Sequence, residues 1–162
     1  MDYYALMFNF QEDVSGNGFL ARVSARGRAL AVREDDGWWV NGVEPGAIAA
    51  SGDSPGEACL AFELSFRKVL YDFAEDSDIY ESFKREVLRF FYERDTTEEK
   101  RWETCVSEPA GTKTLRDRFF DKLPTLPMSP ATVMVERLDE NARTFKPSEN
   151  RPVEYYVPTT AA

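Results

Sequence analysis

The sequence GDSPG, from Gly52 to Gly56, matches the G-x-S-x-G pattern around the nucleophilic serine of many hydrolases. A nucleophilic serine needs a neighbouring base to take its proton, and that base is usually histidine. The chain contains no histidine. Pro55 also lacks the main-chain N–H that would help to bind an oxyanion beside Ser54. We therefore interpret GDSPG as a turn and a helix start.

The absence of histidine removes further classes of chemistry. A chain of 162 residues with 0 His has no imidazole base, no imidazole metal ligand and no Cys-His pair. Its 2 cysteines, Cys59 and Cys105, do not have the spacing of a metal site. We expect a protein that is not an enzyme and that uses no cofactor and no metal.

Carboxylates offer the main catalytic alternative. A meander sheet with one helix on it is similar to part of the RNase H fold, whose two-metal chemistry needs about three or four converging Asp or Glu. The candidates are Asp13, Asp35, Asp36 and Asp53. All four fall in predicted turns, where acidic residues cap the main chain and bind water. A carboxylate- and magnesium-dependent nuclease-like enzyme on an RNase H-like sheet is therefore kept as an alternative function.

The charge of the chain is −9 and is unevenly distributed. Residues 1–94 hold 10 Lys and Arg against 17 Asp and Glu, which gives −7, and residues 95–162 hold 10 against 12, which gives −2. An acidic surface repels nucleic acid and attracts basic proteins. We expect no direct binding of nucleic acid and a protein partner or a homo-oligomer. An acidic mimic of nucleic acid is a further alternative.

The chain shows no signal for a membrane. No apolar run reaches the roughly 18–20 residues of a transmembrane helix, and the N-terminus lacks the basic start of a signal peptide. We expect a cytoplasmic protein.

The sequence predicts β-strands in the first part of the chain. Turn signals separate strand-like runs, and they include Gly16, the run 26–28 and an acidic turn that ends at Gly37. The strand-like runs are 3–10, 19–25, 29–33 and 38–40, with a short run at 47–50. The pattern predicts an antiparallel β-meander of about four strands.

A long amphipathic helix follows. Ser54 is the predicted N-cap, Pro55 occupies the first helical position, and Glu57 completes a capping box. The predicted buried stripe comprises Ala58, Ala61, Phe62, Ser65, Phe66, Val69, Leu70 and Phe73, and the face expected in water carries Glu63, Arg67, Lys68 and Asp72. Periodicity predicts further helices at about 78–94 and at 95–107, where Asp95-Thr96-Thr97-Glu98 is a second predicted capping box. A short helix with Leu115, Phe119, Phe120 and Leu123 is also predicted.

These elements predict an α+β fold with three regions. Residues 1–94 form the core, residues 95–123 a helical extension packed on that core, and residues 124–162 a C-terminal arm that holds six of the 9 prolines. Within the arm, 132–138 and 153–157 are strand-like. We expect one or two short strands at the edge of the sheet.

The stretch of about 45 residues from 29 to 73 resembles the HicB-like antitoxin module, a partial RNase H-like fold. The matching residues are Asp36-Gly37-Trp38-Trp39-Val40, Glu44-Pro45-Gly46, Gly52-Asp53-Ser54 and Glu57-Ala58. The resemblance implies a β-β-β-α-β module without catalytic activity that covers the RNA-binding surface of a small basic ribonuclease toxin and often oligomerises. Where these antitoxins carry a DNA-binding domain, the chain carries further helices and the arm.

The candidate partner-binding residues are Trp38, Trp39 and Glu44. Neighbouring residues of a strand point to opposite faces of a sheet, so only one tryptophan lies under the long helix. The other is covered by another part of the chain or lies at the surface, where a large aromatic side chain favours binding. We predict a non-enzymatic protein-binding module that neutralises or regulates a basic protein partner, or assembles with itself.

Overall fold

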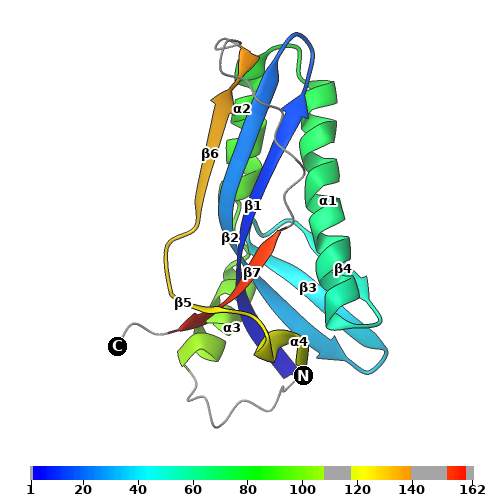
Figure 1. The fold of residues 1–162 in the computed structure, drawn as a ribbon, viewed down its shortest axis with the longest axis vertical. Helices are drawn as coiled ribbons and strands as arrows, with labels where there is room; N and C mark the ends of the chain where they lie inside the picture. Colours follow the sequence, from blue (N-terminus) through cyan, green and yellow to red (C-terminus); the bar gives the residue numbers. More distant parts are fainter. Residues whose placement is uncertain (1, 108–117, 140–152, 160–162) are drawn as a thin grey trace.

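The computed structural model describes residues 2–107, 118–139 and 153–159 as an α+β fold built on one mixed sheet of 7 strands (Figure 1). The strands run in the order β4-β3-β2-β1-β7-β5, and β6 pairs with β2. Their bounds are β1 Asp2–Ser15, β2 Leu20–Glu34, β3 Gly37–Glu44, β4 Ala49–Gly52, β5 Thr125–Pro127, β6 Thr132–Arg137 and β7 Glu154–Thr159. The helices are α1 Pro55–Asp76, α2 Tyr80–Tyr92, α3 Thr96–Ser107 and α4 Arg118–Asp121.

The first four strands form the predicted antiparallel meander. The predicted turn at residues 26–28 is wrong, because β2 continues through it and pairs with β1 from end to end. A side chain at Gly27 would begin 2.3 Å from the ring of Phe8 and 2.8 Å from the oxygen of Glu44. Gly27 is therefore explained by close packing within the sheet and not by a turn.

The strands of the C-terminal arm extend the sheet on both sides of the β1–β2 hairpin. β3 pairs with the Arg28–Glu34 segment of β2, and β6 pairs with its Ala21–Arg26 segment. On β1, the outer edge pairs with β7. The two strand-like runs expected in the arm thus form β6 and β7, and the parallel β5–β7 pair adds a third strand.

One face of the sheet is covered by α1 and α2. The predicted cap of α1 is confirmed, because Ser54 Oγ accepts a hydrogen bond from the Glu57 N–H (3.2 Å) and Glu57 accepts one from the Asp53 N–H (3.0 Å). The GDSPG pattern is therefore a helix cap. The largest buried side chains on this face are aromatic and include Phe8, Phe62, Phe66, Phe83 and Phe91.

One part of the predicted water-facing side of α1 is buried instead. Arg67 Nε binds Glu12 of β1 at 2.9 Å and Arg67 Nη1 binds Glu63 at 3.0 Å, and all three side chains are partly or largely buried. Glu12 points from β1 toward the helices, so it requires a cation and a hydrogen-bond donor on α1. The helical periodicity of the sequence alone does not reveal this contact between Arg67 and Glu12.

The opposite face of the sheet is covered in part by α3. Trp102 of α3 is fully buried in a second hydrophobic cluster with Met7, Leu30, Val32 and Val43. Asp95 caps α3 as predicted, because its carboxylate accepts the Glu98 N–H at 3.0 Å. The helix expected around Phe119 is the single turn α4, and Leu115, which we assigned to it, lies outside the described residues. Among the helices described, none has the length and apolar composition needed to cross a membrane.

Candidate protein-binding surface

The two neighbouring tryptophans of β3 lie on opposite faces of the sheet, as predicted. Trp38 is 7% exposed, and its ring centroid lies 5.6 Å from that of Phe120 of α4. Trp39 is 37% exposed. Side chains alternate between the two faces along a strand, so Trp39 lies on the same face as Val43. Val43 packs in the cluster under α3. Trp38 is therefore a core residue, and Trp39 is the tryptophan available to a partner.

Trp39 lies close to an acidic turn. Trp39 pairs with Val32 of β2 and with Ser51 of β4. The Trp39–Val32 pair lies two positions along the hairpin from the Glu34–Gly37 pair, where the turn begins. The turn residues Glu34, Asp35 and Asp36 are all exposed. An exposed indole beside several carboxylates offers a flat apolar contact together with attraction for cations.

Glu44 lies at the far end of the same strand. It follows Trp39 by five positions along the strand, which is roughly 17 Å. Burial raises the pKa of the Glu44 carboxyl, and the nearby charges of Arg94 and Arg28 act in the opposite direction. Glu44 thus interacts with cations of its own chain, and the structure does not bring it together with Trp39.

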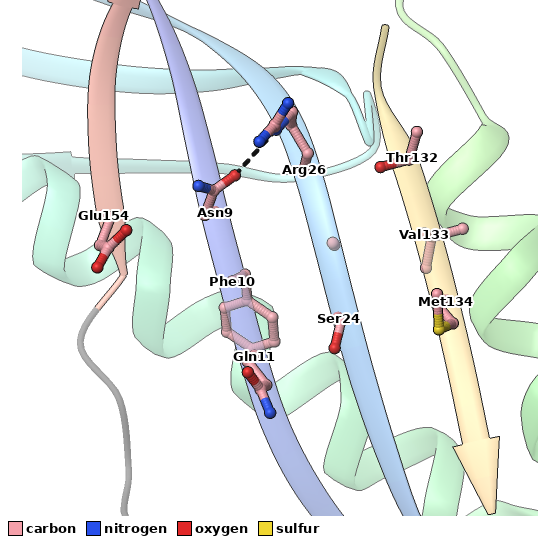
Figure 2. A pocket seen from close by; sticks show the side chains of 10 residues that line it. Asn9, Phe10, Gln11, Ser24, Arg26, Thr132, Val133, Met134 and Glu154 are labelled. Carbon is pink, nitrogen blue, oxygen red and sulfur yellow. Dashed lines mark hydrogen bonds between the residues drawn. The ribbon is translucent and has the colours of Figure 1, made fainter. Parts of the chain in front are cut away.

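A second uncovered region lies across β7, β1, β2 and β6. Figure 2 shows the residues that line an open hollow of about 580 Å³ in this region. The lining residues that point outward include Asn9, Gln11, Ser24, Thr132 and Met134. These residues come from strands that are distant in the sequence. Sequence reasoning missed the hollow for that reason, although alternate polar residues in β1 and β2 were the available signal.

Two arginines of β2 in and beside this hollow are bound by neighbouring side chains. Arg26 Nε donates to Asn9 Oδ1 (3.1 Å), and Arg26 Nη1 donates to Ser129 Oγ (3.1 Å). Arg22 forms an ion pair with Asp13 at 2.9 Å. Arg22 and Arg26 of β2 are thus engaged within the chain, and the lining of the hollow mixes polar and apolar side chains with the charged residues Arg26 and Glu154.

The described residues do not show the geometry of a carboxylate metal site. Across residues 2–107, 118–139 and 153–159, no group of three or more Cys, Asp or Glu is placed to hold a metal ion. Of the four candidate aspartates, Asp13 pairs with Arg22, while Asp35 and Asp36 lie in the β2–β3 turn. Asp53 belongs to the cap of α1.

Two further titratable groups, Glu12 and Cys59, are buried in the core. Glu12 accepts hydrogen bonds from Arg67 and from the hydroxyl of Tyr71 (2.6 Å). Burial raises the pKa of the Cys59 thiol to about 12, so the thiolate that a nucleophile requires is disfavoured.

No protein-family model, no curated protein and no solved structure matches this chain.

Proposed function

We propose that this protein is a non-enzymatic, cytoplasmic protein-binding module that resembles HicB-like antitoxins and binds a basic protein partner through the tip of the β2–β3 hairpin. The observation that carries the proposal is the exposure of Trp39 beside the acidic turn at Glu34, Asp35 and Asp36. The resemblance over residues 29–73 supports a small basic ribonuclease as the partner.

The chemistry of the tip suits such a partner. Tryptophan contributes strongly to interfaces because it buries a large rigid surface with little loss of side-chain entropy. A guanidinium or ammonium group of the partner would stack on the indole of Trp39. The neighbouring carboxylates would speed the encounter with a cationic surface and favour it over anionic competitors.

The test is co-expression with the small basic protein encoded by a neighbouring gene, followed by calorimetric titration of the two purified chains. We expect Trp39→Ala to weaken binding by about 10-fold or more, as for a typical interface hot spot. Tyr92→Ala is the matched control, because Tyr92 is an exposed aromatic residue on α2. Sedimentation of the chain alone measures self-assembly. Equal binding and equal assembly of the Trp39→Ala variant and the unmodified protein would refute the proposal.

A further inference from the structure

A row of exposed apolar side chains runs along the outer side of α1, and its last member, Tyr71, reaches back to Glu12 of β1 through its hydroxyl. Leu60 and Leu64 are 54% and 55% exposed, and Tyr71 is 45% exposed. At about 100° per residue, these three positions fall within roughly 40° of one another around the helix axis. They lie opposite the buried residues Phe62 and Phe66, and Figure 1 shows α1 at the margin of the molecule. We call Leu60, Leu64 and Tyr71 the outer stripe.

The aromatic member of the outer stripe is held in position. The hydroxyl of Tyr71 donates to Glu12 at 2.6 Å, and Glu12 is itself bound by Arg67. The hydroxyl is therefore fixed while nearly half of the side chain remains exposed. A side chain that is ordered before binding loses less entropy when a partner covers it.

The rim of the outer stripe is acidic. The exposed carboxylates next to the stripe are Glu57 at its start and Glu75 at its end, with Asp72 farther round the helix, against the exposed cation Lys68. Within α1, all of which is described, the last turn holds no basic residue. Acidic residues at a helix C-terminus are unfavourable, because they face the negative end of the helix dipole. The charge pattern is thus not explained by the stability of the helix.

We propose that the outer stripe is the docking site for a cationic amphipathic helix of another protein. From Leu60 to Tyr71 the stripe spans roughly 16 Å, which matches about three turns of a partner helix. Apolar residues of that helix would cover the two leucines and the ring of Tyr71. Its Lys or Arg residues would meet Glu57 at one end of the stripe and Glu75 at the other.

A second copy of this chain does not fit the outer stripe. Parallel pairing of two α1 helices would place Glu75 against Glu75 of the other copy. Antiparallel pairing that sets Leu60 against Tyr71 would place Glu57 beside Glu75 of the other copy. Like charges oppose both arrangements, and the acidic rim also opposes an anionic membrane surface.

This surface goes beyond the proposed function, because α1 and Trp39 lie on different faces of the sheet. The probe is a labelled synthetic helix of about 18 residues with leucine on one face and lysine on the other. Two control peptides accompany it: a scrambled peptide of the same composition without an apolar face, and a matched peptide with glutamate in place of lysine. The full chain is titrated against each by fluorescence anisotropy at about 150 mM salt, where weak surface attraction is screened.

We expect the Leu/Lys helix to bind and both control peptides to bind at least about 10-fold more weakly. The double variant Leu60→Ser/Leu64→Ser should lose at least about 10-fold in affinity, and Glu75→Gln should lose several-fold. Ile79→Ser is the matched control, since Ile79 is also more than half exposed and lies outside the stripe. Circular dichroism of each variant verifies folding.

Three outcomes would overturn the inference. Equal binding of the scrambled peptide would show general charge attraction, and full binding by the Leu60→Ser/Leu64→Ser variant would show that the stripe is not used. Dimerisation of the chain that this double variant abolishes would assign the stripe to self-assembly. The Trp39→Ala variant should bind the Leu/Lys helix normally, so failure of this inference and failure of the proposed function are separable.

Discussion

The indole Nε1 of Trp102 donates a hydrogen bond of 3.0 Å to the main-chain oxygen of Leu6, which lies 96 residues earlier in the chain. This buried bond joins α3 to β1 on the face of the sheet opposite α1. The guanidinium of Arg28 stacks over the same indole, 4.6 Å from the ring centroid. Trp102 therefore determines which part of this face α3 covers and which part stays open.

The first prediction concerns this bond. Trp102→Phe keeps an aromatic ring but removes the N–H that Leu6 accepts, so we expect a loss of about 1–3 kcal/mol in the free energy of unfolding. Urea denaturation measures it. Trp39→Phe, at an exposed position, should change stability by less than about 0.5 kcal/mol. Equal stability of the two variants would contradict the buried position of Trp102.

The second prediction concerns the packing of Gly27. Gly27→Ala brings a methyl group against the Phe8 ring and the Glu44 oxygen, and we expect a cost of about 1–3 kcal/mol. Gly56→Ala is the matched control, because the new methyl group would lie 3.7 Å from Phe119 in ordinary contact. In the first turn of α1, alanine should be neutral or stabilising. Thermal unfolding of both variants measures the difference, and a tolerated Gly27→Ala would contradict the close packing of Gly27 against Phe8 and Glu44.

The third prediction concerns the pH dependence of Tyr71. Its hydrogen bond to Glu12, together with burial and the charge of Glu12, raises the pKa of Tyr71 to about 12. A raised pKa means that the protonated hydroxyl is favoured in the folded protein. Its stabilising effect is therefore complete below the ordinary pKa of about 10 and is lost as the pH rises toward about 12.

Two variants test this effect. Glu12→Gln should lower the pKa of Tyr71 toward its ordinary value, as measured by NMR of the labelled tyrosine ring with Tyr71→Phe for assignment. As the pH rises from about 10 to about 12, the free energy of unfolding should fall less in Tyr71→Phe than in the unmodified protein. An unchanged Tyr71 titration in Glu12→Gln would show that the hydrogen bond is not responsible for the shift.

The fourth prediction concerns the thiols. Cys59 and Cys105 are both buried, and a pKa of about 12 leaves roughly 10⁻⁴ of Cys59 as thiolate at pH about 8. We expect both to react very slowly with a thiol reagent in the native protein and rapidly in guanidinium. Fast labelling of Cys59 in the native protein would contradict its position under Tyr155, whose hydroxyl binds the Cys59 carbonyl.

The fifth prediction concerns the fluorescence of the 3 tryptophans. Because Trp38 and Trp102 are buried and Trp39 is exposed, a polar quencher should act on Trp39 first. Trp39→Phe should remove most of the accessible emission, and Trp38→Phe should leave it nearly intact. Similar quenching of both variants would mean that Trp38 is also accessible.

The resemblance to the HicB-like module stays a prediction, and so do the three regional boundaries. The sheet does follow the expected order of strands up to α1. After α1 comes the helix α2, and the strand beside β1 is β7, which runs antiparallel.

The sequence by itself determined the features that depend on neighbouring residues. The cap at Ser54 and Glu57 was predictable because a capping box involves only the first turn of a helix. The opposite orientation of Trp38 and Trp39 was predictable because side chains alternate along any strand.

Only the tertiary structure decided which tryptophan is exposed, because alternation does not say which face receives α1. Tertiary structure also explains why residue 27 is glycine, because the ring of Phe8 on another strand leaves no room for a side chain. It likewise explains the burial of Arg67, whose partner Glu12 lies 55 residues away. Each of these depends on contacts between distant parts of the chain, and local patterns of residues carry no information about such contacts.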